Sequence, residues 1–276
     1  MHHNNHTDIN LFMIKKAIFS IAFTLSFILL SAQTAAKLEV RYSMKFIPDS
    51  TKKNNASYAD VTLLCNENES LYYSPDAKKY YDYLYKKTRE MSGNKIDLGS
   101  LPAYPKVRGN VYRNGSTITA TLPVSKYNYS FEEPQLKWEL LKDTKTIDGM
   151  KCNLAQTTTD TGDIFFAWYT QQYPFSEGPF RFKGLPGLII KLYNKNNTIE
   201  INASEIRQSS EIIEPLSLGR IIKLKSKEEF LKARKTYYEN PNINSLGDDI
   251  IIKDDRGTDY TKRRKDELSS QNVFLD

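Results

Sequence analysis

Short runs of alternating apolar and polar residues, separated by turn residues, recur along most of this 276-residue chain. The clearest run covers residues 37–47, where every second residue from Leu38 to Phe46 is apolar. A period of two places those side chains on one face of a half-buried strand. Weaker runs of the same kind lie at residues 59–64, 70–74, 106–113, 116–122, 136–141, 151–158, 164–170, 188–193 and 198–203. The chain is therefore predicted to form mainly β-structure.

Turn residues join several of these runs into hairpins. Asn114-Gly115 predicts a type I′ turn, Asp160-Thr161-Gly162 a second turn, and the polar residues 194–197 a third. Apolar residues recur at helical spacing only near 76–91 and 227–239. Because these helices do not alternate with strands, we predict a mainly β, α+β fold, with a curved antiparallel sheet or half-barrel that carries two helices and one long loop.

The first 32 residues have the three parts of a secretory signal peptide. Lys15 and Lys16 form a basic region, residues 17–30 are apolar or small, and Ser31-Ala32 precede the expected cleavage site. The apolar stretch is shorter than the about 20 residues of a membrane-spanning helix, so we expect no transmembrane span after cleavage. We expect export to the periplasm, the outer membrane or the medium, with residues 33–276 as one domain. Met13 is an alternative start.

Histidine occurs only at positions 2, 3 and 6, before the expected cleavage site. The processed chain would have no imidazole, which excludes Ser-His-Asp and Cys-His catalysis and histidine-bound metal. No cofactor motif is present, and the pairs Asp248-Asp249 and Asp254-Asp255 lack the spacing of a calcium loop. We therefore expect neither a cofactor nor a metal. The basic cluster at 262–265 is short, so no nucleic-acid partner is expected.

Cysteine occurs twice, at Cys65 and Cys152. In an oxidising compartment the two could form a disulfide. Two buried free thiols that pack as small apolar residues are the alternative. The sequence leaves both open.

The segment from Gln171 to Gly187 is long for a connection between strands and is rich in aromatic residues, proline and glycine. Connections of this length are usually lids, binding loops or disordered, and the aromatic residues argue against disorder. Two interpretations remain: a loop that packs on the sheet and covers its core, or a rim that closes over a ligand or docks a partner. Pro186-Gly187 suits the centre of a type II turn.

Residues 184–189 read Gly-Leu-Pro-Gly-Leu-Ile, and with them the chain resembles the GLPGLI family of exported Bacteroidetes proteins. The resemblance extends to the strand-like segments 147–152 and 167–170 and to Pro174, Gly178-Pro179 and Phe182. It implies export, a β-rich fold and a role in the cell envelope, without a particular activity.

The candidate ligand- or partner-binding residues belong to this loop and to the strand before it. They are Trp168, Tyr169, Tyr173, Pro174, Phe175, Gly178, Pro179, Phe180, Phe182, Gly184, Leu185, Pro186 and Gly187.

Three functions remain open. The favoured one is a non-catalytic envelope protein that binds an apolar or amphipathic molecule, or an outer-membrane partner, through the aromatic loop and the curved sheet beside it. A deep apolar cavity bordered by Trp168, Phe175, Phe180 and Phe182 is the structure that this function predicts. A hydrolase without histidine would use two carboxylates, for which Asp148, Asp163 and Glu177 are candidates. A structural or assembly role is the third. The triplet at 160–162 resembles that of aspartic proteases, but a polar turn that tolerates Asn at position 160 explains it better.

Overall fold

The computed structural model describes residues 34–90, 101–216, 218–239 and 266–275. The predicted signal peptide with Met13, the two aspartate pairs at 248–255 and the basic cluster at 262–265 lie outside the described residues.

Strands dominate the described chain, and helices α2 (Pro75–Arg89) and α3 (Lys227–Glu239) match the two predicted helices. The strands are β1 (Leu38–Phe46), β2 (Ser57–Cys65), β3 (Glu69–Tyr73), β4 (Asn110–Asn114), β5 (Thr117–Val124), β6 (Tyr127–Glu132), β7 (Glu139–Ile147), β8 (Met150–Thr158), β9 (Ile164–Thr170), β10 (Leu188–Asn194), β11 (Ile199–Gln208) and β12 (Ile221–Lys223).

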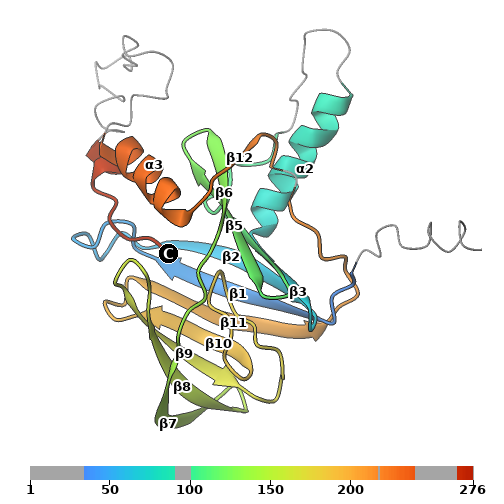
Figure 1. Ribbon diagram of the computed structural model, residues 1–276, viewed down its shortest axis with the longest axis vertical. Helices are drawn as coiled ribbons and strands as arrows, with labels where there is room; N and C mark the ends of the chain where they lie inside the picture. The colour runs from blue at the N-terminus through green and yellow to red at the C-terminus, as the bar shows by residue number, and fades with distance from the viewer. Residues whose placement is uncertain (1–33, 91–100, 217, 240–265, 276) are drawn as a thin grey trace, which may run out of the picture. The chain divides into compact units, whose positions relative to one another are not determined.

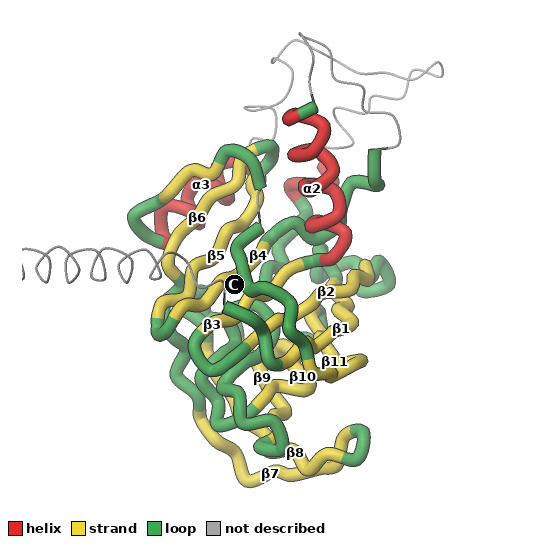
Figure 2. The backbone as a smooth tube through the Cα atoms, turned by 90° about the vertical axis from the view of Figure 1, so that its right-hand side faces the viewer, coloured by secondary structure: helices red, strands yellow, loops and turns green. Residues whose placement is uncertain are grey.

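These strands form one 12-stranded open sheet in the order β12-β6-β5-β4-β3-β2-β1-β11-β10-β9-β8-β7. Two antiparallel meanders, β1 to β6 and β7 to β11, make up all of the sheet except β12, and they join where β1 pairs with β11. Figure 1 shows this junction between β1 and β11, and Figure 2 shows β7 and β8 at one end of the sheet and β6 at the other, beside α3. The chain must therefore cross from one end of the sheet to the other between β6 and β7.

The mainly β, antiparallel prediction is confirmed, and the curved sheet is open rather than closed. Two strands were not predicted: β6, and the three-residue β12, which pairs with β6 in parallel. The β4–β5 hairpin exists, but its two-residue loop is Gly115-Ser116, and only Gly115 has positive φ. A type I′ turn needs positive φ at both central residues, so the predicted turn type was wrong.

The main core lies on one face of the sheet, to which β1 contributes every second residue, and a smaller separate cluster contains Leu64, Leu71 and Tyr73. Leu38, Val40, Tyr42 and Met44 are all buried, as the period of two predicts. The central strand β10 is apolar on both faces from Leu188 to Ile190 and is buried throughout that stretch.

Helix α2 begins at Pro75, directly after a residue that can cap its N-terminus. Ser74 is extended and its hydroxyl accepts a hydrogen bond from the amide of Ala77, while Pro75 occupies the first turn. Helix α3 packs against β5 and β6. Within the described residues, neither these nor any shorter helical segment combines the length and the apolar composition needed to span a bilayer.

Candidate functional site

The loop 171–187 lies on the sheet and contributes to the core. Its middle, from Glu177 to Lys183, is buried. The loop is hydrogen-bonded to the start of β10, because the amides of Leu188 and Ile189 donate to the carbonyls of Tyr173 and Glu177 at 3.1 and 2.9 Å. Phe182 packs against Phe165 with ring centroids 4.5 Å apart. The core-covering interpretation of the loop is therefore correct for most of its length.

A buried carboxylate anchors this loop to β4. Glu177 is 1% exposed and accepts hydrogen bonds from Arg113 and from Lys183, the latter at 2.5 Å. The guanidinium of Arg113 also donates to the carbonyls of Asn68 and Gly115 at 2.8 and 2.9 Å. Since Arg113 further donates to two carbonyls at residues 66 and 67, all its side-chain N–H groups have partners. We call Glu177, Arg113 and Lys183 the Glu177 cluster.

A second buried cluster joins four separate segments of the chain. Arg181 from the loop and Lys227 from the start of α3 both contact Glu133, at 3.0 and 2.9 Å, and both contact Asp160. Arg181 also donates to the carbonyl of Pro134 at 2.9 Å. This Arg181 cluster holds the loop, the β6–β7 crossover, the β8–β9 turn and α3 together.

The two carboxylates of the Arg181 cluster differ in exposure and in pKa. The Glu133 side chain is 0% exposed, and this burial raises its pKa. The positive charges of Arg181 and Lys227 offset the increase only in part. Burial also acts on Asp160, but there the hydrogen bonds and charges of Arg181 and Lys227 prevail and lower the pKa. Asp160 therefore forms a partly buried ion pair as well as a turn, and the prediction that it serves only the turn was wrong.

The turn at Pro186-Gly187 differs from the predicted type II turn. The amide of Gly187 donates to the carbonyl of Leu185 at 2.8 Å, which closes a three-residue turn around Pro186, and the amide of Leu188 bonds elsewhere. Gly187 has a φ of +153°, and a Cβ there would lie 2.3 Å from the carbonyl oxygen of Thr170. Glycine is required mainly because the end of β9 passes so close.

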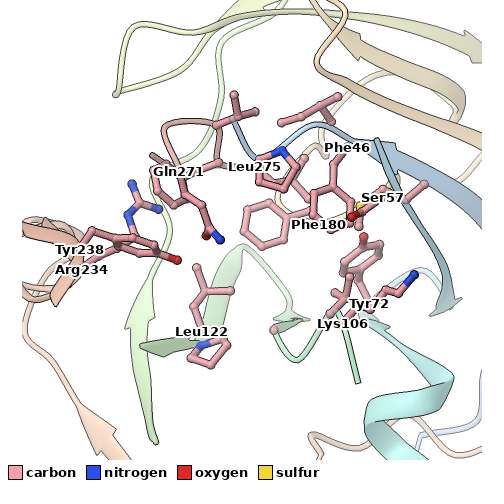
Figure 3. A pocket seen from close by; sticks show the side chains of 18 of the residues that line it. Phe46, Ser57, Tyr72, Lys106, Leu122, Phe180, Arg234, Tyr238, Gln271 and Leu275 are labelled. Atoms are coloured by element: carbon pink, nitrogen blue, oxygen red, sulfur yellow. The ribbon is translucent and has the colours of Figure 1, made fainter. Parts of the chain in front are cut away.

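A cavity of about 520 Å³ lies between the sheet, α3 and the C-terminal segment. Its sheet side consists of Met44, Phe46, Ser57, Tyr72 and Leu122, with Phe180 from the loop. Its other side consists of Phe230, Arg234 and Tyr238 of α3 and of Gln271 and residues 273–275. Figure 3 shows Arg234 and Tyr238 on one side of this cavity and Tyr72, Ser57 and Lys106 on the other.

The C-terminal segment is fixed as a wall of the cavity. The amide of Asn272 donates to the carbonyl of Pro48 at 3.0 Å, and the Asn272 side chain exchanges two hydrogen bonds with Ser50. Phe274 packs against Tyr238, and the Arg234 guanidinium lies 3.8 Å from the Phe274 ring centroid. These contacts place the apolar side chains of residues 273–275 toward the cavity.

The described residues that line this cavity include no carboxylate, imidazole or thiol. Most of the lining is aliphatic or aromatic, and Lys106 and Arg234 supply the charged groups. A cavity of this volume with a few polar groups is typical of small-molecule binding sites.

The expected cavity bordered by Trp168, Phe175, Phe180 and Phe182 was wrong in three of its four residues. Only Phe180 lines the large cavity. Phe182 is fully buried in the core, and Trp168 is 9% exposed, with the Lys145 ammonium 4.1 Å from its ring centroid.

The other candidate residues differ in their surroundings. Pro174, Phe175 and Gly184 line a smaller pocket of about 320 Å³ beside Arg113. Tyr169, Gly178, Pro179, Leu185 and Gly187 are buried, Tyr173 is partly buried and Pro186 is exposed. Because Arg113 and Lys183 already bind Glu177 and backbone carbonyls, the smaller pocket offers little for recognising a charged ligand.

The predicted carboxylates do not form a catalytic pair. Asp148 precedes β8 and Asp163 follows it, so the length of the nine-residue strand, about 30 Å, separates them. Glu177 is buried and paired with two cations. The carboxylates that do meet, Glu133 and Asp160, share the same two cations, and solvent does not reach Glu133.

The two cysteines are free and buried, so the disulfide alternative is not realised. Cys65 is the last residue of β2 and Cys152 lies in β8, and four strands of the sheet separate β2 from β8. Burial and then the charge of Glu177 raise the pKa of the Cys65 thiol to about 12. Among the described residues, no group of three His, Cys, Asp or Glu side chains could hold a metal ion.

Comparison with known proteins gives a family match over this loop and the strands that flank it. Residues 157–191 match the model of a family described as "Protein of unknown function (Porph_ging)". This family is associated with Bacteroidetes, as the resemblance in the sequence implied. No curated protein matches.

Solved structures resemble the chain only weakly. A structure of PNGF-II is 13% identical with a TM-score of 0.49, covering 81% of this chain but 40% of that one. An uncharacterised conserved protein from Thermus thermophilus is 6% identical with a TM-score of 0.33, covering 70% of this chain and 92% of the other. A DUF1329 family protein from Desulfovibrio piger is 8% identical with a TM-score of 0.26 and the same coverage.

Proposed function

We propose that this protein is a non-catalytic binding protein of the cell envelope, which holds an apolar or amphipathic molecule in the cavity between the sheet, α3 and the C-terminal segment. The observation that carries the proposal is the cavity of about 520 Å³ with its largely apolar lining. Burial of apolar ligand surface contributes about 25 cal/mol per Å², so such a cavity favours a hydrocarbon ligand.

The proposal includes export, because the first 32 residues have the pattern of a signal peptide. It also includes membership of the GLPGLI family, for which the sequence at 184–189 is the support. In this account the loop rich in glycine and proline is structural: it closes the core and supplies Phe180 to the cavity wall.

Two alternatives have less support. A hydrolase would need accessible carboxylates, whereas Glu177 and Glu133 are buried and bound to cations. An outer-membrane partner would need an exposed docking surface, and no surface feature of the described residues indicates such a partner.

Titration with N-phenyl-1-naphthylamine, a neutral apolar dye, tests the binding function. We expect one dye molecule per chain, with fluorescence that increases on binding. Leu122→Trp places a larger side chain in the cavity and should weaken dye binding on the order of fivefold or more, because the indole occupies volume that the dye would otherwise fill.

Leu140→Trp is the matched control. Leu140 lies on β7, at the other end of the sheet, and is 58% exposed. It should leave dye binding unchanged. Equal dye binding by the wild type and Leu122→Trp, or no binding by either, would contradict the proposed function.

A further inference from the structure

The charged groups of the cavity have one sign. Every described residue that lines it is either uncharged or a cation, and Lys106 lies at its solvent-facing edge. The Lys106 ammonium makes a long hydrogen bond of 3.4 Å to the carbonyl of Tyr58. Among the described residues, Lys106 has no carboxylate partner, so its charge is available to a ligand.

Tyr72 supplies a second polar group on the same side of the cavity (Figure 3). It is 1% exposed and its hydroxyl has no hydrogen-bond partner among the described residues. Tyr42, another buried tyrosine of the core, donates its hydroxyl to the carbonyl of Ile189 at 2.9 Å. Buried hydroxyls in folded proteins nearly always have partners, so the unpaired donor at Tyr72 requires an explanation.

The chemistry of Tyr72 restricts that explanation to an acceptor. Burial raises the pKa of the phenol, so the group stays protonated and donates. Phe180 packs edgewise on its ring, at 6.2 Å between ring centroids, and offers no acceptor oxygen from its side chain. A ligand oxygen that enters from the cavity would satisfy the donor.

We propose that the ligand is an anionic amphiphile of the long-chain carboxylate type, with its oxygen-bearing head on the side of Tyr72 and Lys106 and its hydrocarbon chain toward Phe230 and the C-terminal segment. This inference rests on the proposed binding function and specifies the ligand class. Phe230, Val273 and Leu275 provide an apolar surface for the chain.

Displacement of the bound dye by three chain-matched probes tests the inference. The probes are dodecanoate, 1-dodecanol and dodecyltrimethylammonium, each used below the concentration at which it aggregates or separates from water. Dodecanoate should displace the dye from the wild type at lower concentration than the cationic probe. Lys106→Gln should raise the Kd of dodecanoate about 2- to 5-fold, as expected for an exposed ion pair, and leave that of dodecanol unchanged.

Tyr72→Phe should raise the Kd of dodecanol about 2- to 10-fold, which corresponds to one neutral hydrogen bond, and that of dodecanoate about 10-fold or more, because a hydrogen bond to a carboxylate is charge-assisted. Because the hydroxyl has no hydrogen-bond partner among the described residues, Tyr72→Phe should not lower the thermal stability of the ligand-free protein. Tyr42→Phe should lower it, since the carbonyl of Ile189 loses its donor, without changing the preference among the probes.

Lys195→Gln, in the turn between β10 and β11, removes the same charge from a residue that does not line the cavity and should change none of the Kd values. The inference is overturned if the cationic probe displaces the dye as well as dodecanoate does, or if Lys106→Gln and Lys195→Gln have the same effect. In both cases the dye still binds, so the proposed function survives. If the dye does not bind at all, the proposed function itself fails.

Discussion

Alanine substitutions at Gly187, Gly178 and Gly184 separate two reasons for glycine in the loop. A Cβ at Gly178 would lie 2.5 Å from the carbonyl oxygen of Phe182, without positive φ. A Cβ at Gly184 would meet no atom within 4 Å, but φ there is +94°. Gly187 combines both features, with φ at +153° and a Cβ position 2.3 Å from the Thr170 oxygen.

The magnitudes follow from these contacts. Positive φ alone costs about 1–2 kcal/mol for a residue with a side chain, so Gly184→Ala should lower the free energy of unfolding by about that amount. A forced contact with backbone costs about 1–3 kcal/mol because the backbone must shift, which applies to Gly178→Ala. Gly187→Ala should cost about 2–5 kcal/mol, a large part of a typical stability of about 5–15 kcal/mol.

Thermal unfolding followed by circular dichroism measures these costs. For a domain of this size, 1 kcal/mol corresponds to about 2–4 °C, so Gly187→Ala should lower Tm by about 5–20 °C and Gly184→Ala by about 2–8 °C. The order of the three variants is the decisive result. If Gly187→Ala unfolds no earlier than Gly184→Ala, the close approach of β9 to Gly187 does not constrain the fold, and the reasoning is refuted.

Three further predictions concern the buried charges and thiols. Glu177→Gln should lower the free energy of unfolding by about 3–5 kcal/mol in urea denaturation, because two buried cations lose their carboxylate; a loss below about 1 kcal/mol would contradict the buried-pair account. Arg181 and Lys227 lower the pKa of Asp160 although burial acts in the opposite direction. The ionised Asp160 therefore stabilises the fold above its unfolded pKa of about 3.9, and this contribution is lost as the pH falls toward the folded pKa. The stability difference between the wild type and Asp160→Asn should therefore be largest near neutral pH and shrink below about pH 4; a difference independent of pH would count against the ion pair. Cys65 and Cys152 should not react with a thiol reagent in the native protein at about pH 8 but should give two thiols per chain in denaturant, and a count of zero there would show a disulfide.

Much of the fold could be predicted because strand and helix periods are local properties. The alternation from Leu38 to Phe46 predicts β1 and its buried face, and the spacing near 76–91 predicts α2. β12 could not be predicted, because a three-residue strand is too short to show a period. β6 was missed although it has an alternating signal of its own in Tyr127, Tyr129 and Phe131.

The candidate site could be predicted only in part, because the cavity is non-local. Met44, Phe180 and Leu275 come from β1, the loop and the C-terminal segment, and nothing in their local sequence brings them together. The aromatic loop was correctly identified as an unusual segment, but its density of aromatic residues reflects a role in the core.

The buried ion pairs were missed for a related reason. Arg181 and Lys183 stand among aromatic residues, where a charge would ordinarily point to solvent. Their partners Glu133 and Glu177 become visible only in the folded chain, where burial of a charge is tolerated because it is paired.

The most direct test of the central claim is mass spectrometry of what the protein carries when it is purified from the envelope of the cells that produce it. Solvent extraction of the purified wild type should release one class of acidic, long-chain molecule in near-stoichiometric amount. The same preparation of Leu122→Trp should release much less, and Leu140→Trp as much as the wild type. Two results would contradict the claim that the cavity is the binding site. In the first, the wild-type protein carries no small molecule; in the second, Leu122→Trp carries the same small molecule in the same amount as the wild type.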